Sequence, residues 1–189
     1  MEHKAVLKTL KFFGIVFMGV SIIELVFALL IGLAPVNINN KSVLLATILL
    51  GSGILPLEGT LFWIFLMFLV CCFLILGFAL YKLSSAEKLD VMTLTKYLSI
   101  LGMLILIMTL IKIEYIVLLQ KTVVDYTTGS DPATFQSFLE NFNITPIYAA
   151  VLWICFLSIS CGYLVIGLVI SAGALKFQIE IERNEGSTN

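Results

Sequence analysis

Two ionisable side chains lie inside long apolar stretches of the sequence, where charge is costly. Glu24 is near the middle of the run 12–33, and Lys112 is past the middle of the run 97–119. A charged side chain at the centre of a membrane helix costs about 2.5–3.5 kcal/mol on insertion scales, so Glu24 should face the protein interior, either protonated or paired. A rise of about 1.5 Å per residue places Lys112 only about 5 Å away in depth, within reach of its stem.

The sequence leaves three interpretations of Glu24 and Lys112 open. The two can form a buried pair that fixes which faces of two helices meet, or they can serve as a proton or cation relay or a lipid-headgroup site. Alternatively, Lys112 extends its stem to the outer surface of the membrane. Glu114 is two residues further on, so it points to nearly the opposite side of its helix and is expected at that surface with Tyr115.

The other reactive side chains form no recognisable catalytic motif. His3 is the sole histidine, which excludes a bis-histidine haem and disfavours a zinc site. The sequence contains no P-loop, G-x-S-x-G or H-E-x-x-H motif. We therefore expect no catalytic residue, no metal and no cofactor. Four cysteines lie inside apolar runs and are expected to be inert packing thiols, namely Cys71, Cys72, Cys155 and Cys161.

The elements that position these residues are apolar runs long enough to cross a membrane. The chain has 189 residues, of which 60% are hydrophobic and only 12% charged, about half the charge of a soluble domain. Its net charge of −1 gives no reason to expect a nucleic-acid partner. A span of about 20 apolar residues crosses the hydrocarbon layer. The sequence predicts an all-α bundle of four transmembrane helices over residues 12–33, 60–81, 97–119 and 146–175.

The lysine and arginine residues predict the orientation. Eight of them lie in the lead-in 1–11, the loop between the second and third spans, and the polar tail 176–189, whereas the other two loops carry two. The positive-inside rule then puts both termini in the cytoplasm, in the plasma membrane or an endomembrane. Both N-x-S/T sequons, at Asn40 and Asn143, fall in the loops predicted to lie outside, so the protein is a candidate glycoprotein.

Both outer loops are expected to carry short surface helices. The apolar stretch Val43–Leu55 is too short to span and predicts an interfacial or re-entrant helix, with Ser42 as its cap and Gly51 ending its first half. In the second loop, Asp131 and Pro132 are typical cap and first-turn residues. An apolar stripe follows at helical spacing and should pack on the bundle or bind a partner; it consists of Phe135, Phe138, Leu139 and Phe142.

The fourth span carries two pairs of small residues four apart, Ser158 with Gly162 and Gly167 with Ser171. Such pairs let helices approach closely in lipid, within one chain or between chains. The four-span layout is similar to that of tetraspanins, but the second outer loop lacks their Cys-Cys-Gly motif, and the first lacks the Trp and cysteine pair of claudins. No family is assigned on these residues.

The function that the sequence favours is non-catalytic. Short loops and spans nearly free of catalytic side chains are typical of an accessory subunit or organiser of a membrane assembly, with membrane lipids and other membrane proteins, or a second copy of this chain, as partners. The alternative is a small transporter or channel-like protein that uses Glu24 and Lys112. An intramembrane enzyme would need a bound cofactor.

Overall fold

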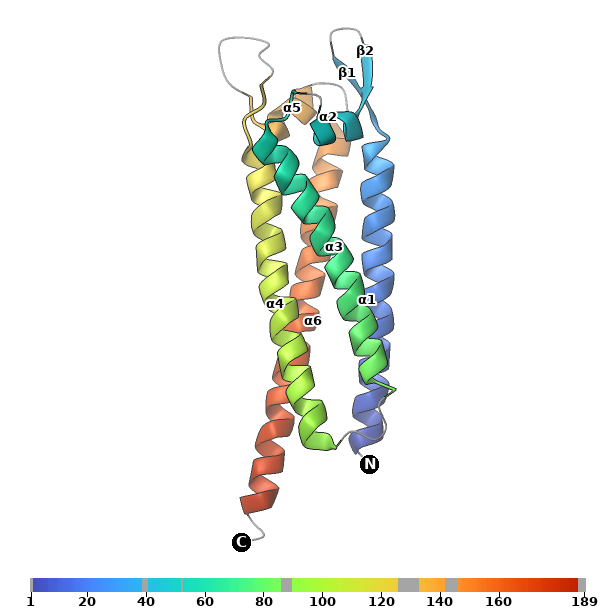
Figure 1. Cartoon of the computed structure of the whole chain (residues 1–189), viewed down its shortest axis with the longest axis vertical. Helices are drawn as coiled ribbons and strands as arrows, with labels where there is room; N and C mark the ends of the chain where they lie inside the picture. The colour runs from blue at the N-terminus through green and yellow to red at the C-terminus, as the bar shows by residue number, and fades with distance from the viewer. Residues whose placement is uncertain are drawn as a thin grey trace. The chain divides into compact units, whose positions relative to one another are not determined.

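A computed structural model describes most of the chain (Figure 1). The described residues are 2–38, 41–51, 53–85, 90–125, 133–141 and 146–186. They form six helices and one hairpin, with the bounds α1 Glu2–Gly32, β1 Pro35–Ile38, β2 Lys41–Leu44, α2 Leu45–Gly51, α3 Leu57–Leu83, α4 Val91–Lys121, α5 Phe135–Asn141 and α6 Pro146–Gly186.

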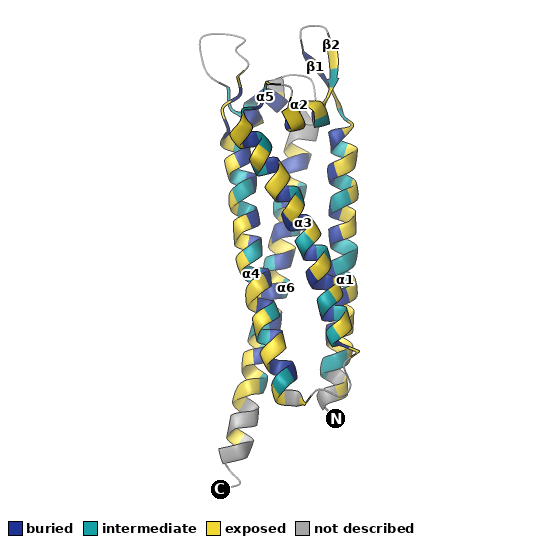
Figure 2. Ribbon diagram, in the orientation of Figure 1, coloured by how far each residue is buried: buried dark blue, intermediate teal, exposed yellow. Residues whose placement is uncertain are grey.

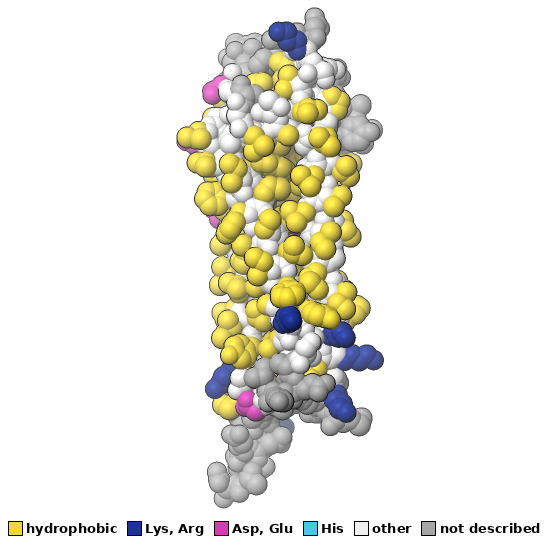
Figure 3. All heavy atoms as spheres, turned by 45° about the vertical axis from the view of Figure 1, so that its right-hand side comes forward, with side chains coloured by type: hydrophobic (Ala, Val, Ile, Leu, Met, Phe, Trp, Pro, Cys, Tyr) yellow, Lys and Arg dark blue, Asp and Glu magenta, His cyan; other side chains and the backbone are white. Residues whose placement is uncertain are grey.

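In the described part of the chain, four helices are long and apolar enough to cross a membrane. Their qualifying stretches are Val6–Gly32, Leu57–Leu83, Met92–Lys121 and Ala150–Ile179. The prediction of four membrane-length apolar helices is therefore confirmed, and the chain has the length and composition of an integral, multi-pass membrane protein. Each long helix carries buried and exposed residues (Figure 2). Hydrophobic side chains cover the middle of the face drawn in Figure 3, as a lipid environment requires.

The long helices extend beyond the predicted spans. α1 begins at Glu2, so the basic lead-in is helical, and α6 continues to Gly186, into the segment predicted as a polar tail. The chain divides into two compact units that cut across all four long helices. Unit 1 comprises Met1–Ile22, Cys72–Leu110 and Cys161–Asn189, and unit 2 comprises Ile23–Cys71 and Ile111–Ser160. Both ends of the chain and the connection between α3 and α4 therefore belong to unit 1.

The start of α4 is fixed by Asp90, outside the membrane-length stretch. The backbone N–H of Thr93 lies 3.3 Å from Oδ2 of Asp90, which is N-cap geometry. A hydrogen bond from the Thr93 side chain, with a smaller contribution from the Lys96 charge, holds the pKa of the Asp90 carboxyl below its ordinary value. The carboxylate therefore stays ionised at the positive end of the helix dipole.

Unit 1 contains a buried aromatic cluster made of Phe17, Phe73 and Tyr163. The Phe73 and Tyr163 rings stack with centroids 4.4 Å apart, and Phe17 lies 4.6 Å from Tyr163. The Ser21 hydroxyl donates to the Phe17 carbonyl, so its single proton is used. The hydroxyl oxygens of Ser21 and Tyr163 lie 2.9 Å apart. Because the Ser21 proton is already used, the Tyr163 hydroxyl is the donor in this hydrogen bond. The cluster thus satisfies its buried polar atoms internally.

Close contact between α1 and α3 in unit 1 depends on two glycines. A Cβ on Gly14 would lie 2.6 Å from the backbone nitrogen of Tyr81, and a Cβ on Gly77 would lie 2.9 Å from the backbone nitrogen of Met18. Gly14 and Met18 are one turn apart on α1, as are Gly77 and Tyr81 on α3. The two backbones therefore meet at both glycines, where a larger residue would force them apart.

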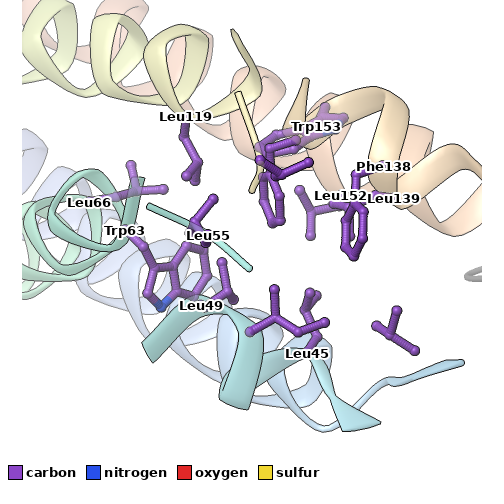
Figure 4. Packing of buried hydrophobic residues seen from close by; sticks show 14 of the residues in the cluster. Leu45, Leu49, Leu55, Trp63, Leu66, Leu119, Phe138, Leu139, Leu152 and Trp153 are labelled. Carbon is purple, nitrogen blue, oxygen red and sulfur yellow. The ribbon is translucent and has the colours of Figure 1, made fainter. Parts of the chain in front are cut away.

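Unit 2 has a core of large apolar side chains from the long helices and from both loops (Figure 4). We call this set the unit 2 core; its labelled members are Leu45, Leu49, Leu55, Trp63, Leu66, Leu119, Phe138, Leu139, Leu152 and Trp153. Edge-to-face contacts tie distant parts of the chain together, with Phe135 6.2 Å from Trp153 and Trp63 6.2 Å from Phe156. The loops of unit 2 are thus packed parts of the structure.

The first of these loops contains an antiparallel hairpin that the all-α prediction missed. β1 pairs with β2 from Pro35 opposite Leu44 to Ile38 opposite Lys41. The prediction that Ser42 caps a helix is wrong, because Ser42 pairs with Asn37 and α2 begins only at Leu45. Alternating burial of β1 shows the reason, since Val36 and Ile38 point into the core and favour an extended chain.

The predicted end of the short apolar helix at Gly51 is confirmed. Gly51 is the last residue of α2 and has a φ of +137°, which a side-chain-bearing residue rarely adopts. The backbone N–H of Leu45 donates to the Ala34 carbonyl at 2.9 Å and closes the base of the hairpin. The hairpin and α2 therefore form one folded segment between α1 and α3.

The second loop contains the expected amphipathic helix, α5, with a different start. Thr134 accepts the backbone N–H of Ser137 on its side-chain oxygen at 3.3 Å and so caps the helix. The predicted cap residues, Asp131 and Pro132, and the last member of the stripe, Phe142, lie outside the described residues. The other three stripe residues are almost fully buried in the unit 2 core, namely Phe135, Phe138 and Leu139.

Candidate functional site: the buried pair of Glu24 and Lys112

Glu24 lies on the buried face of α1. Phe17, Ser21, Glu24 and Ala28 recur at steps of four, three and four residues and are all buried, as expected for one face of a helix with 3.6 residues per turn. The neighbouring residues Ile22 and Ile23 are exposed. The apolar residues surrounding Glu24 in sequence make the helix, and the helix period turns the carboxylate away from lipid.

Lys112 occupies the equivalent position on α4. Ile105, Thr109, Lys112 and Ile116 form its buried face at the same spacing. The hydroxyl of Thr109 donates to the carbonyl of Ile105 at 2.7 Å, so it is satisfied within its own helix. The side chain of Lys112 is fully buried and does not extend to the surface.

The structure brings Glu24 and Lys112 together inside unit 2. The Lys112 ammonium donates a hydrogen bond to Oε1 of Glu24, and both side chains are 0% exposed. Both side chains can be buried because each takes the place of the water that the other loses on leaving solvent. Of the three interpretations, the extension of Lys112 to the surface is therefore wrong.

The carboxyl group of Glu24 and the amino group of Lys112 can exchange a proton or bind an ion. Their interaction with each other or with an ion is strong because no bulk water reaches them. Removing either partner would leave one charge buried alone, which proteins tolerate poorly. The pair can therefore act as a lock between α1 and α4, or as a site where charge enters the membrane interior.

Glu114 takes no part in this site. It is exposed, two residues from the fully buried Lys112, as the helix period predicts. Its neighbour Tyr115 stacks on Phe65 with ring centroids 5.7 Å apart and lies 5.8 Å from Phe62. This aromatic group attaches α4 to α3 within unit 2 and leaves the carboxylate of Glu114 pointing outward.

The two small-residue pairs of α6 behave differently. Gly167 packs against Ile105 and Leu106, and Ser171 packs against Gly102, all on α4 in unit 1. Ser158 and Gly162 are exposed, and a Cβ on Gly162 would meet nothing within 4 Å. Within the described part of the chain, Gly162 therefore makes no close helix contact, and the packing of this pair against another helix stays a prediction. Five residues separate Gly162 from Gly167, a rotation of about 140° around the helix, so both pairs cannot face α4.

The cysteines form no site with one another. All four belong to the described residues, and none of them forms a disulfide. Cys71 and Cys161 are exposed on their helices rather than packed, whereas Cys72 and Cys155 are half-buried. No group of three or more His, Cys, Asp or Glu side chains able to hold a metal occurs among the residues that the structure describes. The sequons at Asn40 and Asn143 fall outside those residues.

Several residues that matter to the packing are harder to recognise from sequence. Ser21 and Tyr163 form a buried hydrogen bond across unit 1, and Gly77 and Gly102 form close helix contacts. The glycines could have indicated these contacts. Gly14, Gly77 and Gly102 all lie inside apolar runs where alanine would make a more stable helix, so each glycine needs another reason, such as close packing.

Comparison of the chain with protein families, with characterised proteins and with solved structures finds no match.

Proposed function

We propose that this protein is a non-catalytic component of a membrane assembly, an accessory subunit or organiser that acts through helix packing. The observation that carries the proposal is the exposed small-residue face of α6. Gly162 is exposed and has open space around it, while Gly167 and Ser171 of the same helix pack closely on α4. In lipid, helices associate through close packing at such small residues. The open face at Gly162 suits one further helix.

The exposed residues next to Gly162 support the same use. Val165 and Ala172, three and ten residues after Gly162, continue the exposed face along α6 in unit 1. Small and β-branched side chains on this face let a second helix approach closely without strain. The partner is another membrane protein or a second copy of this chain.

Native cysteines allow a direct test of this face. Cys161 is exposed beside Gly162, and Cys71 is exposed on α3. We expect a short bis-maleimide to crosslink the protein in native membranes through Cys161. Cys161→Ser should abolish the product and Gly162→Leu should reduce it about tenfold, because a bulky side chain forces the helices apart.

Two controls make the crosslinking result specific. Cys71→Ser should leave the product unchanged, and Gly19→Leu, which also enters open space in unit 1, should leave it unchanged too. Purification in mild detergent that recovers only monomer, together with crosslinking that does not depend on Cys161, would contradict the proposal.

The second candidate is a small transporter or channel-like protein. The fully buried pair of Glu24 and Lys112 favours it, because ionisable side chains within membrane spans often mark ion or proton paths. In this case the pair would load and release a proton or cation during each cycle.

We also propose that both termini lie in the cytoplasm, that α2 and α5 lie at the opposite membrane surface, and that Asn40 and Asn143 are glycosylation sites there. The eight lysines and arginines of the ends and of the middle connection, against two in the other loops, support this orientation. The membrane is the plasma membrane or an endomembrane.

Accessibility of single cysteines tests the orientation. The test uses a cysteine-free variant of the protein expressed at the cell surface, with one cysteine added at a time. An impermeant maleimide should label Asp125→Cys in intact cells, because Asp125 is exposed in unit 2. Ser85→Cys, exposed in unit 1, should be labelled only after permeabilisation. Labelling of Ser85→Cys in intact cells would reverse the proposed topology.

A further inference from the structure

Unit 1 contains a pocket of about 400 Å³ between α1, α4 and α6. Its apolar wall includes Leu10 and Phe13 of α1, Leu98 of α4 and Gly173 of α6, and its polar lining residues are Thr9 and Lys176. The volume falls in the range of small-molecule binding pockets, which are mostly apolar with a few polar groups that orient the ligand.

The charge around the pocket selects an anionic ligand. Lys176 lines the pocket and is exposed. Lys8 and Lys11 are also exposed at this end of α1, but on the face turned away from the pocket, where the Lys11 ammonium lies 5.8 Å from the centroid of the Tyr81 ring. No carboxylate is among the described side chains that line it. Figure 3 shows basic side chains gathered at the end of unit 1 where the hydrophobic surface stops.

We propose that this pocket binds one anionic phospholipid, with an acyl chain against its apolar wall and the phosphate at Lys176. An acyl chain matches the apolar lining, and an ammonium group is a point charge that suits a phosphate. Each lysine near an anionic membrane surface contributes about 1 kcal/mol of attraction. A second copy of this chain that used the same surface would bring its own Lys176 against this Lys176, so like charges disfavour it as the occupant.

Gly173 allows the pocket to be filled without strain. A Cβ at this position would meet nothing within 4 Å, so Gly173→Leu places its side chain in the pocket and leaves the backbone undisturbed. The matched control is Gly19→Leu, which also enters open space in unit 1 but does not line the pocket. If Gly173→Leu fails to fold, Val169→Trp fills the pocket from an exposed lining position of α6.

Native mass spectrometry of the full chain tests the proposal, with phosphatidylglycerol and phosphatidylcholine of identical acyl chains added to the detergent-solubilised protein. We expect the protein to retain one phosphatidylglycerol about tenfold more strongly than phosphatidylcholine. Gly173→Leu should lose about tenfold in retention of phosphatidylglycerol, while Gly19→Leu keeps it.

The charge requirement is tested separately. Lys176→Gln should lower phosphatidylglycerol retention about fivefold and leave phosphatidylcholine retention unchanged, because only the anionic headgroup loses an attraction of about 1 kcal/mol. Lys82→Gln, exposed in unit 1 away from the pocket, is the control. Equal retention of the two lipids by the wild type, or equal loss in Gly173→Leu and Gly19→Leu, would overturn the proposal and leave only general contact with bulk lipid.

Discussion

Replacing Glu24 by Gln is expected to lower the free energy of unfolding by about 3–5 kcal/mol, because the Lys112 ammonium would be left in a fully buried position without its carboxylate. Lys112→Gln should cost a similar amount. Thermal unfolding of the purified protein in mild detergent measures both. The control is Glu114→Gln, two residues from Lys112 but exposed, which should stay within about 0.5 kcal/mol of the wild type.

The double variant Glu24→Leu with Lys112→Leu separates the loss of a partner from the worth of the pair. Buried ion pairs replaced by apolar residues of similar volume are often neutral or more stable. We therefore expect the double variant to recover most of the stability that each single variant loses. Loss in the double variant equal to the sum of the single losses would show that the two residues do not act as a pair.

The double variant also distinguishes the two candidate functions. In an accessory subunit, the pair only locks α1 to α4, so the stable double variant should keep its Cys161-dependent crosslink. In a transporter, the same variant should fold and yet lose all proton or cation flux in proteoliposomes, because the only charges buried in the described spans are gone. Flux that persists in the double variant would exclude a path through this pair.

Replacing Gly14 by Ala is expected to lower the free energy of unfolding by about 1–3 kcal/mol. The added Cβ would lie 2.6 Å from the backbone nitrogen and 2.9 Å from the Cα of Tyr81, so α1 and α3 must move apart. Backbone atoms cannot rotate out of the way as a side chain can. The measurement is the shift in thermal midpoint in detergent.

Gly19→Ala is the matched control for this contact. A Cβ on Gly19, five residues further along α1, would meet nothing within 4 Å. Alanine is the better helix former, so this variant should be neutral or gain up to about 1 kcal/mol. If the two variants had the same stability, the close approach of α1 to α3 would not exist in solution.

Secondary structure could be predicted from the sequence wherever one physical rule, such as the length of an apolar run, was enough to assign it. Apolar runs of membrane length predicted the four long helices, and the helix period predicted that Glu114 points away from Lys112. The hairpin was not predictable in the same way. Val36 and Ile38 alternate with Asn37, but over too few residues to predict a strand. The structure shows both side chains buried in a core that α5 and the long helices supply.

The candidate site was only partly predictable. The cost of burying charge picked out Glu24 and Lys112, and their depths matched. The small-residue pairs of α6 looked equivalent in sequence, yet only Gly167 and Ser171 contact α4, while Gly162 faces outward. Spacing identifies a face of a helix but does not say which neighbour, if any, covers it.

Four membrane-length helices, and two ionisable groups within them that must avoid lipid, follow from the amino-acid sequence alone. Length and hydrophobicity suffice for this, because hydrocarbon excludes charge and unpaired backbone. The three-dimensional packing was needed to show that Lys112 meets Glu24, that Gly14 meets Tyr81 and that the loops of unit 2 share a core. In lipid, a helix that is apolar on every side gains no hydrophobic energy by turning one face rather than another toward its neighbours. The fit of individual side chains therefore sets which faces meet.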